Sequence, residues 1–230
     1  MLKGSEAHHL QKVMRAGKGD IFCAVDGLGK CYRSVITGQK KNNILADVVS
    51  VTRNENEPLM EITVGVALLK NNIMDYAIEK ATECGVSKFI PFRSSNTVVE
   101  IPEKQGIIRK RKRWQNVVRA AVKQSLRTRI PEISDPVKFK EMISGTKEYD
   151  LKLLADPGKN SIALKDIKFK KPKLRVLLIV GPEAGFTVEE LADAKQFGFR
   201  LVHFGSRRLR AETAAALFPL LLLQIAGDLN

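Results

Sequence analysis

The residues best suited to chemistry lie in a turn rich in glycine and proline. The apolar run Val176–Val180 continues into Gly181-Pro182-Glu183-Ala184-Gly185, and Thr187 with Glu190 is typical of a capping box that begins a helix. A strand, a glycine-rich turn and a helix N-terminus form a crevice at the carboxyl edge of a parallel sheet, where α/β folds bind ligands. Glycine lets backbone amides approach such a ligand closely. The spacing matches neither the dinucleotide fingerprint nor the P-loop, which disfavours both sites.

A second segment repeats this arrangement near the carboxyl end. The predicted strand Leu201–Phe204 leads into Gly205-Ser206-Arg207-Arg208-Leu209-Arg210 and then into the apolar helix that begins with Ala211-Glu212-Thr213-Ala214. Three arginines and one glutamate therefore lie where a loop leaves the sheet. They could act on a ligand, or they could form a charged helix cap, with Glu212 near the helix N-terminus and Thr213 as N-cap. The motif alone leaves both interpretations open.

A strong excess of positive charge suggests a polyanionic partner. The 230 residues carry 39 Lys and Arg against 25 Asp and Glu, a net charge of +14. The segment Lys104–Arg129 holds ten basic residues and no acidic one, and Lys159–Arg175 holds seven against Asp166 alone. Like charges one helical turn apart repel each other, so these runs favour contact with nucleic-acid phosphates. A solvated basic face is the alternative.

The elements that must position these motifs divide into two predicted domains. Residues 1–58 contain three short strand-like runs, Asp20–Val25, Cys31–Thr37 and Ile44–Thr52, and end in a polar segment, Asn54–Pro58, that is typical of a linker. Residues 59–230 alternate strands and helices, the pattern of an α/β domain with a parallel sheet. Its predicted strands are Leu59–Leu69, Lys88–Phe92, Leu151–Leu154, Val176–Val180 and Leu201–Phe204, and its predicted helices are Met74–Cys84, Glu103–Leu126, 187–197 and 213–227.

Several classes of protein are disfavoured. Cys23, Cys31 and Cys84 lie far apart without a paired motif, as expected for buried thiols in a reducing compartment. The three histidines lack metal-ligand spacing, so no metal site is predicted. The N-terminus shows no apolar signal segment, and the apolar run Ala214–Ala226 is too short to span a bilayer. We therefore expect a cytoplasmic protein without a membrane partner.

Taken together, the two motifs resemble those of the ribosomal RNA small subunit methyltransferase E family, within the knotted (SPOUT) methyltransferases. The family's G-P-E-G-G and L-R-x-E-T-A elements correspond to Gly181–Gly185 and Leu209–Ala214. Its opening H-x-x-x-V-L-R…G-D is similar to His9–Arg15 followed by Gly19-Asp20. Glu79–Val86 and Gln124–Ile133 are also similar to family segments, so the resemblance covers almost the whole chain.

The resemblance implies a fold and an activity. The fold is α/β: a small N-terminal PUA-like β-barrel (1–58), followed by a parallel-sheet methyltransferase domain (59–230) with a C-terminal trefoil knot. The activity is S-adenosylmethionine-dependent methylation of uridine N3 in 16S ribosomal RNA, for ribosome biogenesis. The partners are ribosomal RNA or the small subunit and a second copy of the chain, because the homodimer completes the site and covers much of the apolar helix Ala214–Ala226.

The resemblance also implies functional residues. The cofactor would lie among loops after Leu154, Val180 and Phe204. Arg210 would stabilise developing charge on the base, and Glu212 would fix Arg210 or accept a proton, although the two could form only a structural ion pair at the dimer interface. The expected cofactor-binding residues are Leu154, Ala155, Gly181, Pro182, Glu183, Gly185, Gly205, Leu209, Thr213 and Ala214. The expected RNA-binding residues are Arg15, Arg109, Arg111, Arg113 and Arg127.

The sequence differs from the family pattern at three points, and three other functions compete with this hypothesis. Ala184 replaces a glycine, Ala211 replaces a threonine, and the segment before the first histidine is shorter than in the family. The rivals are a non-catalytic RNA-binding assembly factor, a knotted methyltransferase for transfer RNA or a ribose oxygen, and a small-molecule enzyme with a basic surface. Binding of S-adenosylmethionine distinguishes the first rival from the enzyme.

Overall fold

The computed structural model describes residues 1–169 and 173–229, which fall into two compact units. The first unit comprises Met1–Glu57 together with Arg127–Arg129, and the second comprises Pro58–Leu126 and Ile130–Asn230. No sequence pattern predicted that residues 127–129 belong with the N-terminal strands. Part of the predicted basic run Lys159–Arg175, namely Lys170 and Lys171, lies outside the described residues.

The first unit is built on a three-stranded antiparallel sheet in the order β1-β2-β3. The strands β1 (Ile21–Val25), β2 (Lys30–Lys40) and β3 (Asn43–Arg53) cover the three predicted runs. At the β1–β2 turn, the Asp26 carboxylate accepts hydrogen bonds from the backbone N–H groups of Lys30 and Leu28, which lower the pKa of Asp26. The described strand pairings give an open sheet rather than the closed barrel that the resemblance implied.

A short helical segment, which the sequence patterns did not predict, covers part of this sheet. The α-helix α1 (Gly4–His8) runs directly into a π-helix, His9–Val13. Ala7 and Leu10 from these turns pack with Ile36 and Ile44 of the sheet in a small core. A ten-residue segment with two buried positions has too little periodicity to be recognised as a helix.

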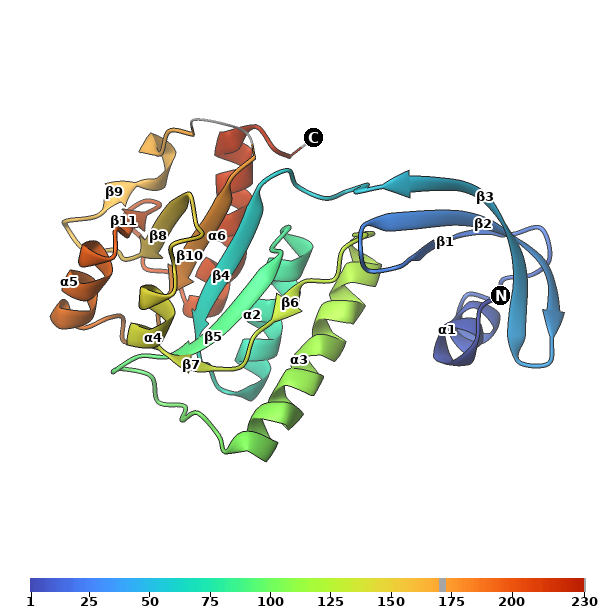
Figure 1. The fold of residues 1–230 in the computed structure, drawn as a ribbon, viewed down its shortest axis with the longest axis horizontal. Helices are drawn as coiled ribbons and strands as arrows, with labels where there is room; N and C mark the ends of the chain where they lie inside the picture. Colours follow the sequence, from blue (N-terminus) through green and yellow to red (C-terminus); the bar gives the residue numbers. More distant parts are fainter. Residues whose placement is uncertain (170–172, 230) are drawn as a thin grey trace. The chain divides into compact units, whose positions relative to one another are not determined.

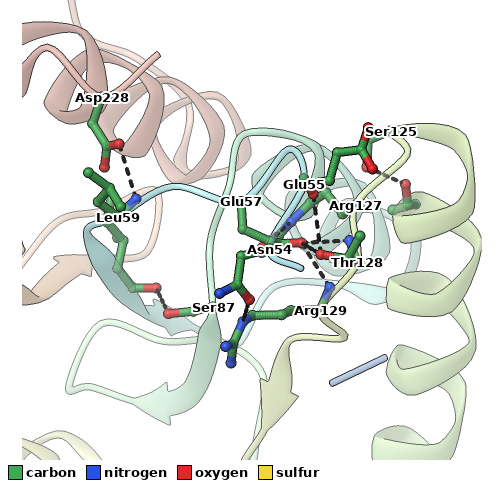
Figure 2. Close-up of polar contacts among 12 residues, drawn as sticks. Asn54, Glu55, Glu57, Leu59, Ser87, Ser125, Arg127, Thr128, Arg129 and Asp228 are labelled. Carbon is green, nitrogen blue, oxygen red and sulfur yellow. Dashed lines mark hydrogen bonds and ion pairs between the residues drawn. The ribbon is translucent and has the colours of Figure 1, made fainter. Parts of the chain in front are cut away.

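The carboxylate of Glu57 anchors the Arg127–Arg129 segment within the first unit (Figure 2). Its Oε2 accepts a hydrogen bond from Nη2 of Arg127 at 2.7 Å, and its Oε1 accepts from the backbone N–H groups of Thr128 and Arg129 at 2.7 and 2.8 Å. The Asn54 side chain accepts from Nε of Arg129. The predicted linker Asn54–Pro58 is therefore a fixed segment here, because its polar side chains bind these partners.

The second unit contains an eight-stranded sheet in which every recorded strand pair is parallel. The main path runs β6-β5-β4-β10-β8-β11-β9, with β7 paired to β5 (Figure 1). The central strands are β4 (Glu61–Ala67), β5 (Lys88–Arg93), β8 (Leu151–Ala155), β10 (Arg175–Val180) and β11 (Arg200–His203). The short edge strands are β6 (Glu132–Ile133), β7 (Val137–Lys138) and β9 (Ile162–Ala163). This architecture confirms the predicted α/β class.

Strand β10 divides the second unit into two cores because its side chains alternate between the sheet faces. Val176, Leu178 and Val180 belong to one hydrophobic cluster, and Leu177 and Ile179 belong to the other. A strand buried on both faces needs a continuous apolar sequence. That requirement explains why the Val176–Val180 run could be recognised from sequence.

Helices cover both faces of the sheet (Figure 1). The first cluster contains buried residues of α2 (Asn71–Glu83), α3 (Lys104–Gln124) and α6 (Ala211–Ala226), and the second contains those of α4 (Phe139–Ser144) and α5 (Val188–Gln196). A single 3₁₀ turn spans Leu164–Asp166. The Thr187–Glu190 capping box at the start of α5 is present as predicted. The alternative with Thr213 as N-cap is wrong, because α6 begins at Ala211 and places Thr213 inside the helix.

The carboxylate of Asp228, just beyond α6, binds the start of β4. It accepts a hydrogen bond from the backbone N–H of Leu59 at 3.0 Å (Figure 2) and one from the backbone N–H of Met60 at 2.8 Å. Strand β4 begins at Glu61, so the predicted strand Leu59–Leu69 is too long at both ends. The contact satisfies two amides that no neighbouring strand pairs.

The cysteines, the possible metal ligands and the apolar helices were also subjects of sequence-based expectations. All three cysteines are free, but only Cys31 is buried, and the expectation of a buried thiol is wrong for Cys23, which is exposed. Within the described part of the chain, no group of three or more His, Cys, Asp or Glu residues could hold a metal ion. Among those residues, no helix is both long and apolar enough to cross a membrane.

Candidate active site

Three neighbouring strands end together at one edge of the sheet. Strand β8 lies between β10 and β11, and Ala155 at its end is in register with both Val180 and Val202. Because these pairs are parallel, the loops that follow the strands leave the sheet on the same side. The backbone N–H of Asp156 donates to the carbonyl of Val202 at 2.9 Å, which holds the first residue of the β8 loop against β11.

The three loops enclose a cavity of about 330 Å³. This volume lies at the lower end of the range for small-molecule and cofactor pockets. The first turns of α6 form part of its wall. The lining residues are Ala155–Gly158 after β8, Val180–Phe186 after β10, Val202–Gly205 and Arg207–Leu209 after β11, and Ala211, Ala214 and Phe218 of α6.

Two glycines in the β10 loop are required by its conformation. A Cβ atom at Gly181 would lie 2.6 Å from the ring of Phe186, so no other residue fits without moving that ring. The Phe186 ring is itself held against Phe92 and Phe139, with centroid distances of 6.2 and 5.3 Å. Gly185 has φ +76°, a backbone conformation that L-residues rarely adopt, and its N–H donates to the Pro182 carbonyl. These contacts and the positive φ restrict the conformation of the loop.

The β11 loop contributes cations and apolar surface to the same cavity. The Arg208 guanidinium donates from Nη2 to the backbone carbonyl of Glu183 at 2.6 Å, which links the β11 and β10 loops. His203 accepts a hydrogen bond at Nδ1 from the N–H of Gly205. Phe204 packs edge-on against Phe218 of α6 with a centroid distance of 4.2 Å. The cavity thus combines apolar walls with a few fixed polar groups, as small-molecule sites do.

Most of the residues expected to bind a cofactor line this cavity. Leu154 does not, because it is fully buried in the second hydrophobic cluster, and Thr213 is absent from the lining although it lies on α6. The expected residues that do line the cavity are Ala155, Gly181, Pro182, Glu183, Gly185, Gly205, Leu209 and Ala214.

The two expected catalytic residues lie at the N-terminus of α6 without lining the cavity. The Arg210 side chain is 84% exposed, and its Nη1 lies 4.0 Å from Oε1 of Glu212, whose side chain is only 14% exposed. A pair at this distance with such an exposed guanidinium is weak, because solvent screens it. Arg210 is therefore available to a substrate that approaches from outside the chain.

The expected RNA-binding arginines differ in exposure. Arg15 and Arg109 are exposed. Arg111 pairs with Asp135 at 2.9 Å, and Arg113 pairs with Asp75. The inference that this basic run lacks acidic partners is therefore wrong, since residues outside the helix supply them. Most of the remaining basic residues of α3 are exposed: Lys104, Lys112, Arg119 and Lys123.

Arg127 lies in a different environment from the other four arginines. Its side chain is 3% exposed and forms the ion pair with Glu57 described above. In this position the guanidinium is not presented to RNA. The burial of Arg127 could not be predicted from the sequence, because its partner Glu57 is 70 residues away along the chain.

Some residues at the site were not singled out from the sequence. Asp156 and His203 line the cavity, and from outside it Asn96 binds the β10 loop and Ser95 binds Glu190 at the start of α5. The sequence could have indicated Ser95 and Asn96, because they follow the predicted strand Lys88–Phe92. Parallel strands end at the same edge of a sheet, which places such residues near the site. Asp156 likewise follows the predicted strand Leu151–Leu154 by two residues.

Comparisons with known proteins identify the family. A family model described as an RNA methyltransferase domain matches residues 55–223, and one described as an RNA methyltransferase PUA domain matches residues 2–49. Ribosomal RNA small subunit methyltransferase E of Bacillus subtilis (strain 168) is 31% identical over 222 residues, which cover 93% of this chain and 85% of that protein. The chain belongs to the ribosomal RNA small subunit methyltransferase E family.

Other members of the methyltransferase E family agree with this assignment. The protein of that name from Mesomycoplasma hyopneumoniae (strain 232) is 33% identical over 175 residues, 76% of this chain and 74% of its own length. The crystal structure of the Neisseria gonorrhoeae methyltransferase E bound to S-adenosyl methionine has a TM-score of 0.85 at 26% identity, and the match covers 96% of this chain and 89% of that one. The PUA domain and the family predicted from the sequence are thereby confirmed.

A second solved structure also carries the cofactor. A methyltransferase from Legionella pneumophila in complex with S-adenosylmethionine has a TM-score of 0.84 at 29% identity and covers 97% of this chain. That match includes 90% of the Legionella chain. The likeness to these solved methyltransferase structures therefore extends over both units of the fold.

Proposed function

We propose that this protein transfers a methyl group from S-adenosylmethionine to N3 of a uridine in small-subunit (16S) ribosomal RNA. The observation that carries the proposal is the cavity of about 330 Å³ formed by three strand-end loops, in a chain of the methyltransferase E family. Two solved structures similar to this chain are described as bound to S-adenosylmethionine.

The residues around the cavity fit this cofactor. Gly181 and Gly205 provide backbone without side-chain bulk, Phe204 and Phe218 provide apolar contact, and Asp156 provides a carboxylate. We assign adenosine binding to the backbone of Ala155, Gly181, Gly205 and Leu209, with Pro182, Glu183, Gly185 and Ala214 completing the walls. The cofactor supplies the activated methyl group and its leaving group, so the protein's own contribution is positioning and electrostatics.

The chemical difficulty lies in the uracil, because N3 carries a proton and is a poor nucleophile until that proton leaves. A guanidinium beside the base stabilises the developing anion, and a carboxylate can accept the proton. We assign the first role to Arg210 and the second, or the orientation of Arg210, to Glu212. The exposure of Arg210 and the loose contact between the two support a functional pair over a structural one.

Four further properties belong to this proposal. RNA would bind exposed basic side chains of α3, such as Arg109, Lys112 and Arg119, and Arg15 of the first unit, because exposed cations can contact phosphates. A second copy of the chain would pack on α6, whose Leu217 remains 38% exposed although eight other residues of the helix are buried within one chain. The trefoil knot rests on membership of the family, and the cytoplasm follows as the location because ribosomal RNA is the substrate.

Methyl transfer to isolated ribosomal RNA tests the function directly. The purified protein is incubated with S-adenosylmethionine and unmodified 16S ribosomal RNA, or small subunits, and the nucleosides are analysed by mass spectrometry. We expect N3-methyluridine to form in one of the two substrates. Methylation of a ribose or of transfer RNA alone would overturn the proposed target. Absence of cofactor binding by calorimetry would replace the enzyme with an RNA-binding assembly factor.

A further inference from the structure

The cofactor loop that follows β10 is held from outside by a second loop, Ser94–Thr97, which follows β5. The Asn96 side chain donates from Nδ2 to the backbone carbonyl of Gly185 at 3.0 Å. The neighbouring backbone N–H of Ser95 donates to Oε1 of Glu190 at 2.8 Å. Two adjacent residues thus bind both ends of the segment that joins the cavity wall to α5.

The Ser94–Thr97 loop is itself rigid enough to serve as a support. Ser94 and Thr97 are buried, their hydroxyl groups lie 2.9 Å apart, and the Ser94 N–H donates to Oγ1 of Thr97. The backbone N–H of Thr97 donates in turn to the Ser94 carbonyl. These bonds close a compact turn with hydrogen bonds of its own, in addition to its contacts with the cofactor loop.

Glu190 connects the Ser94–Thr97 loop with the start of α5. Its side chain is buried, and its second oxygen, Oε2, accepts a hydrogen bond from the backbone N–H of Thr187. One carboxylate therefore joins the first residues of α5 to Ser95. A buried carboxylate is retained only where such donors satisfy it, so this residue does more than cap a helix.

We propose that Asn96, supported by the Ser95–Glu190 contact, is a positioning residue that holds the Gly181–Phe186 loop in its cofactor-binding shape. The proposal rests on the proposed function for its ligand, S-adenosylmethionine, and adds a residue that does not line the cavity. A loop that is ordered before binding avoids the entropic cost of ordering on contact with the ligand. Removal of the Asn96 amide therefore weakens cofactor binding and leaves the chemical step unchanged.

The experiment compares Asn96→Ala, Asn96→Asp and Asn96→Gln with the wild-type full-length chain. We expect Asn96→Ala to bind S-adenosylmethionine about tenfold more weakly by calorimetry, which corresponds to about 1.4 kcal/mol. Its KM for the cofactor rises by a similar factor while kcat at saturating cofactor stays within about twofold. Asn96→Asp is at least as defective because a carboxylate cannot donate to the Gly185 carbonyl. Asn96→Gln keeps the donor and recovers part of the affinity.

Asn42→Ala is the matched control, since Asn42 is an exposed asparagine in the first unit. It should leave cofactor affinity and KM at wild-type values. Wild-type affinity in Asn96→Ala, or a loss of kcat without a change in KM, would overturn the positioning role. Thermal unfolding of each variant without ligand shows whether the fold is retained, and Glu190→Gln tests the same support if Asn96→Ala does not fold.

Hydrogen exchange of the ligand-free protein separates this inference from the proposed function. In Asn96→Ala, peptides that cover 181–186 should exchange at least several-fold faster than in wild type, while peptides of α2 should not change. Unchanged exchange at 181–186 sinks the inference even if methyl transfer is confirmed. Faster exchange together with no cofactor binding by the wild type would retain the support and reject the methyltransferase.

Discussion

The Arg127 guanidinium and the Glu57 carboxylate form an ion pair in which both side chains are almost completely withdrawn from solvent, at 3% and 4% exposure. Nη2 and Nε of Arg127 both bind Oε2 of Glu57, and Oε1 binds two backbone amides of the following residues. Both oxygens of the Glu57 carboxylate therefore accept hydrogen bonds from this segment. The pair fixes these residues within the first unit as a structural element.

Removal of one partner of this pair should be strongly destabilising. In Arg127→Met the Glu57 carboxylate stays buried without its cation, and we expect a loss of about 3–5 kcal/mol in the free energy of unfolding. Urea denaturation of the full chain measures it. Arg111→Met, which breaks an exposed pair with Asp135, is the control and should cost about 0–1 kcal/mol. Equal costs for the two variants would contradict the assignment.

Addition of one methyl group at Gly181 should close the cofactor site. The new Cβ would lie 2.6 Å from the Phe186 ring, which Phe92 and Phe139 hold in place. We expect Gly181→Ala to weaken S-adenosylmethionine binding at least about tenfold by calorimetry. Gly38→Ala is the control, because a Cβ there meets nothing within 4 Å. If the clash is the cause, the double variant Gly181→Ala/Phe186→Leu regains affinity, and no recovery would argue against it.

Charge on α3 should set the salt dependence of RNA binding. Arg109 and Lys112 are exposed, whereas Arg111 and Arg113 already pair with carboxylates. For Arg109→Ala/Lys112→Ala we expect weaker binding and a slope of log affinity against log salt that is smaller by up to about 2. Fluorescence anisotropy across a salt series measures both. Lys195→Ala removes an exposed cation on a different helix, α5, and should change neither the affinity nor the slope. A slope equal to that of wild type would remove α3 from the interface.

Arg210 should affect catalysis without affecting cofactor binding. Because its side chain points into solvent and does not line the cavity, Arg210→Ala should bind S-adenosylmethionine with wild-type affinity. We expect kcat for methyl transfer to fall by about 10²–10³, the loss typical of a removed electrostatic stabiliser. Arg208→Ala is the comparison, since that side chain links two cavity loops and should change cofactor affinity as well. A normal kcat in Arg210→Ala would end the catalytic assignment.

The sequence predicted the parts of the fold whose local pattern matches their environment. Val176–Val180 was recognisable as a strand because β10 is buried on both faces, and the capping box at Thr187 is encoded within four residues. The family motifs also predicted that the loops after β10 and β11 lie together, and both loops line the cavity.

What the sequence could not predict depends on contacts between distant residues. The burial of Arg127 is set by Glu57, 70 positions earlier, and the acidic partners of Arg111 and Arg113 lie in other elements. Asn96 reaches the Gly185 carbonyl 89 residues away. No periodicity or motif contains such pairings, because they arise only once the sheet has formed.

The Asp228 contact has a consequence for the order in which the protein can fold during synthesis. The two amides just before the central strand β4 are satisfied by a carboxylate 169 and 168 residues later in the chain. Strand β4 itself pairs with β10, more than a hundred residues further on. A nascent chain can therefore pair one edge of this apolar strand with β5 early, but its other edge has no partner until β10 has been made. Completion of this unit must follow release of its last helix, and chaperones that shield unpaired strands would act on the chain during that interval.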